Sequence, residues 1–140
     1  MPSFNHSVLQ FRLSLAFSAS QEHSILPELT IELPTGQWLT PDISVLPKTA
    51  IHWLHDTIRV KTVPLLAVEI PSPTQGFQEI ADKIDLYFKH GVQSVWVVQS
   101  AMQAIAIYLP GTDRPQVVTQ GEARDPSTGL TARLETLFAA

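Results

Sequence analysis

Three charged residues stand in or beside apolar segments of the chain. Glu69 ends the apolar run of residues 65–68, Asp42 follows a proline just before another apolar segment, and Lys83 lies on a segment with helical periodicity. Charged side chains are seldom fully buried unless they are paired or bind a metal ion. Strand ends beside loops are also where α/β sheets bind ligands. These three residues are therefore candidates for a functional site.

Two carboxylates at neighbouring strand ends would suit a divalent cation. Mg²⁺ prefers oxygen ligands and keeps several of its waters. A metal ion lowers the pKa of bound water and neutralises charge that develops on a phosphodiester. A nearby ammonium group can position the water or stabilise the transition state. Asp42, Glu69 and Lys83 together thus fit metal-assisted phosphodiester hydrolysis.

Each of the three residues also has an ordinary structural interpretation. Glu69 could reach solvent at the strand end or pair with a lysine. Asp42 could be a turn carboxylate, which is common after proline. Lys83 could form a surface pair with Glu79, one helical turn earlier. These alternatives stay open on the sequence alone.

The elements that must position these residues follow an α/β pattern. Strands are expected at residues 24–33, 41–47, 64–70, 94–99, 104–109 and 115–118, and helices at 5–19, 77–90 and 130–138. Ser3 or Asn5 can cap the first helix, and Gly91 the second. Apolar strands on both sides of a helix indicate a crossover and at least one parallel pair. We predict one α/β domain over residues 1–140, with a mixed central sheet.

Composition excludes several classes. The 140 residues, 44% of them hydrophobic and 16% charged, suffice for one domain with a real core. The chain has no cysteine, so it has no disulfide framework and no thiolate zinc site, which fits a cytoplasmic setting. No segment approaches the roughly 18 apolar residues of a membrane span. The net charge of −4 argues against general nucleic-acid binding, so contact with DNA should be weak and local.

Three longer motifs carry a family resemblance. "PDISV", "LLAVEIPSPT" and "EIADKIDLYFKHGVQSVWVV" resemble the Uma family of proposed endonucleases, a group long known as a domain of unknown function. The closing "TGLTARLETLF" is similar to the end of that family, so the resemblance extends from about His6 to Phe138. The family belongs to the restriction-endonuclease-like superfamily with the PD-(D/E)XK signature. The resemblance implies a mixed sheet flanked by helices and a metal-dependent endonuclease acting on DNA.

The resemblance also implies roles for individual residues. Asp42 and Glu69 match the two acidic metal ligands, and Ile70 matches the position whose carbonyl often coordinates Mg²⁺ or Mn²⁺ in the superfamily. The usual lysine, two residues after the second acid, is replaced here by Pro71. The Uma pattern places its lysine on the following helix, where Lys83 stands. Asp42, Glu69 and Lys83 are thus the expected catalytic residues.

Two further residues match accessory positions, and some positions depart from the pattern. His6 is similar to a histidine on the family's first helix and could contact the scissile phosphate, cap the helix or pack. Tyr87 matches the helix tyrosine. Glu79 stands where aspartate is more usual, and Gln99 where the family more often has an acid. Residues 48–63 have no clear counterpart in the family.

That unmatched segment has two interpretations besides a solvated loop. His52 and His55 have the spacing of one helical face, but a zinc site would need further ligands, for which only Asp56 and Glu22 or His23 are conceivable. The basic residues Arg59 and Lys61 would instead suit a loop that approaches a phosphate backbone.

Other functions compete with the nuclease hypothesis. The same scaffold could be a non-catalytic interaction module, because fold alone does not give function. The same metal centre could also serve hydrolysis of another substrate. A homodimer would suit either function, with Trp96, Tyr108 and the edge strands as a possible interface.

Overall fold

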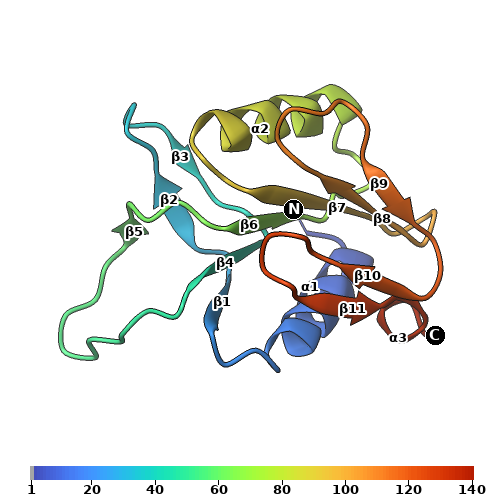
Figure 1. Cartoon of the computed structure of the whole chain (residues 1–140), viewed down its shortest axis with the longest axis horizontal. Coiled ribbons are helices and arrows are strands. Elements are labelled where there is room, and N and C mark those ends of the chain that lie inside the picture. Colours follow the sequence, from blue (N-terminus) through green and yellow to red (C-terminus); the bar gives the residue numbers. More distant parts are fainter. Residues whose placement is uncertain (1) are drawn as a thin grey trace.

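A mixed sheet of six strands forms the centre of the molecule (Figure 1). The computed structural model describes residues 2–140. The strand order is β1-β4-β6-β7-β8-β9. Their bounds are β1 His23–Pro27, β4 Ile43–Pro47, β6 Leu66–Glu69, β7 Ser94–Gln99, β8 Ala104–Tyr108 and β9 Gln116–Val118. The mixed α/β architecture predicted from the sequence is confirmed.

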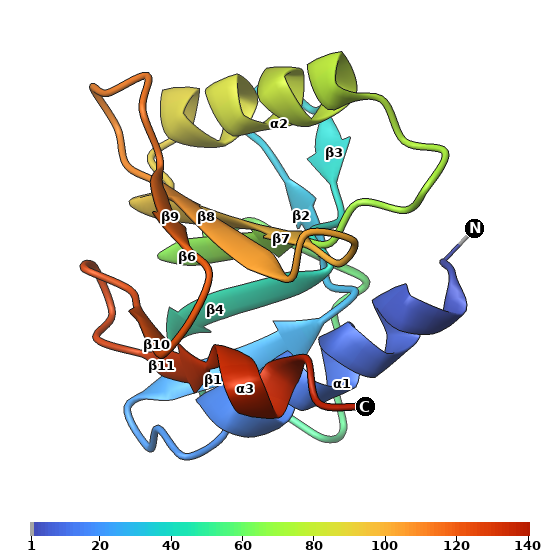
Figure 2. The same cartoon turned by 90° about the vertical axis from the view of Figure 1, so that its right-hand side faces the viewer.

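Two helices cover opposite faces of this sheet (Figure 2). α1, Phe4–Phe17, begins where the Ser3 hydroxyl accepts a hydrogen bond from the backbone N–H of His6 at 3.2 Å. Its inner stripe includes Phe17, whose ring meets Trp96 edge-on at 5.3 Å. α2, Phe77–Lys89, packs its apolar stripe against the other face. Each sheet face is therefore buried, which explains why the central strands are almost wholly apolar.

The strand order around α2 gives the sheet its one parallel pair within residues 2–140. β6 and β7 are parallel and are joined through α2, while β4–β6 and β7–β8 are antiparallel. Gly91 follows the helix with a φ of +96°, a left-handed conformation that glycine adopts without strain. The predicted crossover is present.

Two small sheets flank the central one. The first joins β2 Thr30–Glu32, β3 Trp38–Leu39 and β5 Arg59–Val60. The second pairs β10 Glu122–Arg124 with β11 Thr131–Arg133, which leads directly into the one-turn helix α3, Leu134–Leu137. β3, β5 and β10 are too short to show a period in the sequence, and none of them was predicted.

Three expectations need correction. The single strand predicted at 24–33 is broken at Glu28, whose φ is +56°, so β1 and β2 lie in different sheets. The helix predicted at 130–138 is β11 followed by α3. Trp96 is fully buried against Phe17, so it cannot supply a dimer interface.

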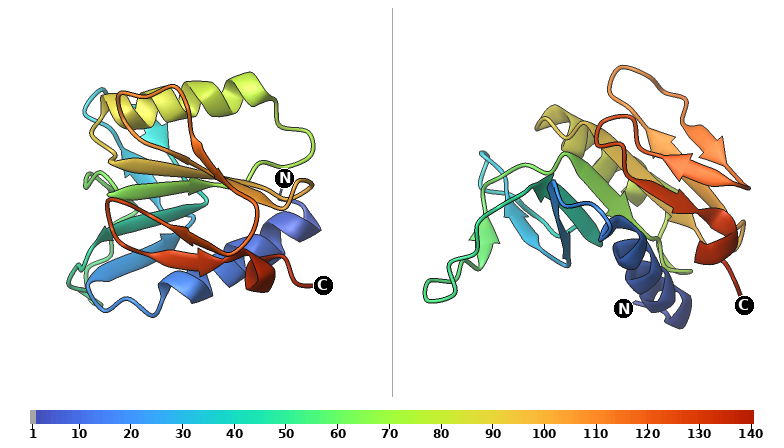
Figure 3. Two further views of the ribbon diagram at one scale, coloured as in Figure 1. Left: turned by 45° about the vertical axis from the view of Figure 1, so that its right-hand side comes forward. Right: turned by 60° about the horizontal axis from the view of Figure 1, so that its bottom comes forward.

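Residues 48–58, here called the arm, extend from the end of β4 away from the rest of the chain (Figures 1 and 3). They contain no helix or strand and are all exposed. The solvated loop considered for this segment is present over residues 48–58, and the short β5 follows it. Within residues 2–140, no helix has the length and apolarity that crossing a membrane requires.

Candidate active site

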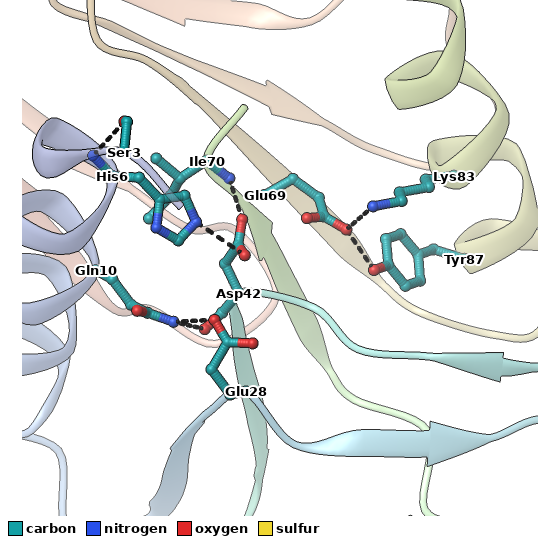
Figure 4. A network of polar contacts seen from close by, with 9 residues as sticks. All are labelled: Ser3, His6, Gln10, Glu28, Asp42, Glu69, Ile70, Lys83 and Tyr87. Carbon is teal, nitrogen blue, oxygen red and sulfur yellow. Dashed lines mark hydrogen bonds and ion pairs between the residues drawn. The ribbon is translucent and has the colours of Figure 1, made fainter. Parts of the chain in front are cut away.

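The pairing of β4 with β6 brings the two predicted acids together. Ile43 stands opposite Val68 in this antiparallel ladder. One residue further along, Asp42 therefore stands opposite Glu69. Residues directly opposite each other in a sheet point to the same side. Figure 4 shows both carboxylates at these strand ends, between α1 and α2.

Asp42 links three elements through its carboxylate. Its Oδ1 lies 3.0 Å from His6 Nε2 on α1, and its Oδ2 accepts a hydrogen bond from the backbone N–H of Ile70 at 2.6 Å. The Asp42 side chain is 18% exposed, whereas His6 is buried. Asp42 is thus held in a fixed orientation while keeping access to solvent.

Glu69 is buried, with only 3% of its surface exposed. Its Oε1 accepts a hydrogen bond from the Tyr87 hydroxyl at 2.6 Å and lies 3.8 Å from Lys83 Nζ. Burial raises the pKa of Glu69 to about 7, although the Tyr87 hydrogen bond and the Lys83 charge oppose the shift, and the Asp42 charge adds to it. Burial, together with the Glu69 charge, also raises the pKa of Tyr87 well above its usual value. The effect of burial on Glu69 therefore outweighs the positive charge of Lys83 beside it.

Glu28 joins the site and was missed in the sequence. Its backbone N–H donates to the Asp42 carbonyl at 3.2 Å. The Gln10 side-chain amide donates to Glu28 Oε1 and to the Asp42 carbonyl, both at 2.8 Å. Pro27, which favours a strand end or edge, was the available signal for a break in this strand. The left-handed backbone at Glu28 then turns its carboxylate toward Asp42 (Figure 4).

An open cavity of about 190 Å³ gives access to these groups. Its polar lining combines the acidic residues with Lys83, Ser72 and Gln75. It is lined by Pro2, His6, Glu28, Asp42, Glu69, Ile70, Ser72, Gln75 and Lys83. The opening means that a ligand from solvent can reach the buried carboxylates.

The donor set fits a divalent cation. One ligand atom from each of His6, Glu28 and Asp42 lies within 4.8 Å of the others, and this is the one such group of three among residues 2–140. Glu69 adds a carboxylate beside Asp42. Among the described residues, Lys83 is the one lysine that pairs with these acids. Oxygen donors with an excess of negative charge match the preference of Mg²⁺.

The structure gathers the predicted site residues into one network. Asp42, Glu69, Ile70, Lys83, His6 and Tyr87 all lie within it (Figure 4). Lys83 points toward Glu69, and Glu79 is not among its ion-pair partners within residues 2–140. His52 and His55 are exposed on the arm and belong to no group of three metal-ligating side chains in the described part of the chain. The roles of the gathered residues are taken up below as a proposal.

Comparison with known proteins identifies the fold and the family of the chain. A crystal structure described as a "putative nuclease belonging to DUF820 from Anabaena variabilis ATCC 29413" superposes with a TM-score of 0.80. The match covers 99% of this chain and 83% of that one at 23% sequence identity, so it shows a shared fold. The model of the Uma2 family, with the description "Putative restriction endonuclease", matches residues 1–137. The chain belongs to the Uma2 family, as the motifs predicted. None of the curated proteins compared with the chain matches it.

Proposed function

We propose that the protein is a divalent-metal-dependent endonuclease that hydrolyses phosphodiester bonds in DNA. The observation that carries this proposal is the buried Glu69, which faces Asp42 across the β4–β6 pair at an open cavity. The Uma2 description and the nuclease description of the structural neighbour support the same class of activity. A cytoplasmic location accords with the cysteine-free composition.

Asp42 and Glu69, with the Ile70 carbonyl, would hold Mg²⁺ or Mn²⁺, and Glu28 and His6 offer further donors. When bound, the ion would neutralise charge on the phosphate and lower the pKa of water. Glu69 has its pKa raised to about 7 by burial, so a cation beside it would favour its ionised form.

The chain's own residues would orient and balance this centre. The Ile70 N–H and His6 fix the two oxygens of Asp42. The Tyr87 hydroxyl holds Oε1 of Glu69 in place. Lys83, 31% exposed at its side chain, carries the positive charge best placed to contact a phosphate in the cavity. Fixed donors of this kind contribute to catalysis because they need no reorganisation during the reaction.

Cleavage of supercoiled plasmid tests the proposal. Wild-type protein should nick or cut it with Mg²⁺ or Mn²⁺ and not with EDTA. Asp42→Asn and Glu69→Gln keep side-chain size and should abolish cleavage, whereas Glu79→Gln, an exposed acid on α2, should not. Linear duplex, single-stranded DNA and RNA assayed alongside would define the substrate. Cation-dependent cleavage that survives both site substitutions would contradict the assignment, and absence of cation binding would favour the non-catalytic interaction module.

A further inference from the structure

The arm carries an unusual set of exposed apolar side chains. Trp53, Leu54 and Ile58 are each 88% exposed, and Ile51 is 66% exposed. We call these four residues the arm patch. Large apolar patches on a monomer surface commonly mark a site of interaction with another molecule. Nothing else within residues 2–140 covers them.

The outer surface of α1 forms a second apolar patch. Phe4, Val8, Phe11 and Leu15 follow one another at spacings of four, three and four residues, which places them on one stripe of the helix. Phe4 is 81%, Phe11 67% and Leu15 60% exposed. The opposite stripe of Leu9, Leu13 and Phe17 is in the core. We call the four outer residues the helix face; it contains no charged residue.

The charges of the arm favour a protein partner over a phosphate backbone. The one basic residue of the arm is Lys48, where the arm begins, and its one acid is Asp56. The basic residues lie at the base, where Arg59 and Lys61 approach Glu32 at 3.8 and 4.0 Å. The Arg59 guanidinium also stacks on the Trp38 ring at 3.6 Å. The phosphate contact considered from the sequence is therefore less suited to the tip of the arm than an apolar contact.

We propose that the arm patch of one copy packs on the helix face of a second copy, and the reverse, around a two-fold axis. The arm and α1 both lie on the side of the molecule away from α2 (Figures 1 and 3). In a two-fold dimer each contact occurs twice, so both patches of both copies are covered. None of the eight patch residues is charged, so contact between the patches does not itself require burying a charge.

The areas agree with a stable dimer. Covering the arm patch would remove on the order of 600 Å² from water, and covering the helix face roughly 400 Å² more. A typical specific interface buries about 800 Å² on each partner. Either patch alone falls short of this area, whereas the two together exceed it. The reciprocal arrangement thus accounts for seven of the large apolar side chains that the monomer exposes, four on the arm and three on α1.

The oligomeric state in solution tests this inference. Sedimentation equilibrium of the full chain from about 1 to 100 µM should give a dimer. Trp53→Glu on the arm and Phe11→Glu on α1 should each raise the dissociation constant by about tenfold or more. Phe77→Glu is the matched control, because Phe77 is a 72% exposed aromatic residue outside both patches. It should leave the dimer unchanged. All three sites are exposed, and circular dichroism melting confirms that each variant folds.

Mixing the two patch variants distinguishes this pairing from others. A heterodimer of Trp53→Glu with Phe11→Glu retains one intact arm-to-helix contact, while either homodimer retains none. The mixture should therefore associate more tightly than each variant alone. A monomeric wild type, or a dimer unaffected by Phe11→Glu, would overturn the proposal. A monomer whose affinity for duplex DNA falls with Trp53→Glu would overturn it as well, and would assign the arm to nucleic acid.

Discussion

The end of β6 and the arm differ in what they bury and expose: the first buries a charged group, and the second exposes apolar side chains. At the end of β6, a carboxylate is almost fully buried. On the arm, a tryptophan and three aliphatic side chains are largely exposed. Burying a charge and exposing a large apolar side chain both cost free energy. The two proposed binding events would offset these costs, with a cation at the end of β6 and a protein surface on the arm.

The two regions differ in how far contacts within the chain offset the free-energy cost of burial or exposure. Glu69 has Tyr87 and Lys83 as fixed partners, yet its pKa stays raised. The arm patch has no apolar cover within residues 2–140. Carboxylates held in fixed positions suit a small cation, because such an ion needs fixed ligands. A projecting segment without cover suits a large partner, which supplies its own surface.

The largest expected effect concerns stability at the end of β6. The folded pKa of Glu69, about 7, exceeds its ordinary value of 4.5, so the folded state binds more protons between these values. In EDTA, the Glu69 contribution to the unfolding free energy should therefore fall as pH rises from 5 to 8, by roughly 2–3 kcal/mol. Glu69→Gln should remove this slope. Urea denaturation of both proteins at several pH values measures it.

Two outcomes refine that test. Saturating Mn²⁺ should raise the stability of wild-type protein more at pH 8 than at pH 5, because the cation stabilises ionised Glu69. An identical pH slope in wild type and Glu69→Gln would show that Glu69 is not the titrating group.

The next effect separates Lys83 from ordinary surface lysines. Lys83→Met should lower kcat for DNA cleavage by about 10- to 100-fold, or roughly 1.4–2.7 kcal/mol, because it removes the ammonium group beside Glu69. Lys89→Met, an exposed lysine at the end of α2, should leave kcat unchanged. Single-turnover cleavage rates compare the two variants. Equal cleavage rates for Lys83→Met and Lys89→Met would show that the Lys83 ammonium group does not contribute to catalysis.

A smaller effect is expected at Glu28. Glu28→Gln keeps the side-chain size but removes one negative charge from the group formed with His6 and Asp42. The dissociation constant for Mn²⁺ should rise by about tenfold, or 1.4 kcal/mol. Isothermal titration measures this value, with the exposed Glu22→Gln as the control. An unchanged constant would confine cation binding to Asp42 and Glu69.

The smallest effect should come from the arm. Trp53→Ser is expected to change the unfolding free energy of the monomer by less than about 0.5 kcal/mol, because an 88% exposed side chain loses few contacts. Denaturation at a protein concentration well below the dimer dissociation constant measures this. A large loss would mean that Trp53 packs within its own chain, and the comparison between the two regions would fail.

Much of the framework could be predicted because its segments have strong local patterns. The run before Glu69 and the stripe containing Tyr87 indicated β6 and α2 without any relative for comparison. The pairing of Asp42 with Glu69 could not be derived this way, since these two residues lie 27 positions apart in the sequence and meet only when β4 pairs with β6. The family resemblance supplied that link.

Glu28 shows where pattern reasoning stopped. Apolar and polar residues alternate after Pro27 and on into β2, so residues 24–33 looked like one strand. A single residue in left-handed conformation ends that strand, and its side chain is stabilised by Gln10 from α1. That contact depends on tertiary structure, and periodicity carries no trace of it. β3, β5 and β10 escaped prediction for a different reason, because two or three residues are too few to establish a period.

The register of β4 against β6 determines whether a folded molecule can form the paired-carboxylate site. Side chains alternate between the two sides of a strand, so sliding one strand by a single residue would send Asp42 and Glu69 to opposite sides of the sheet. A molecule with that error could not assemble a paired-carboxylate centre. Misaligned copies would thus be inert rather than wrongly active, and a cation that requires both acids would enrich correctly aligned molecules.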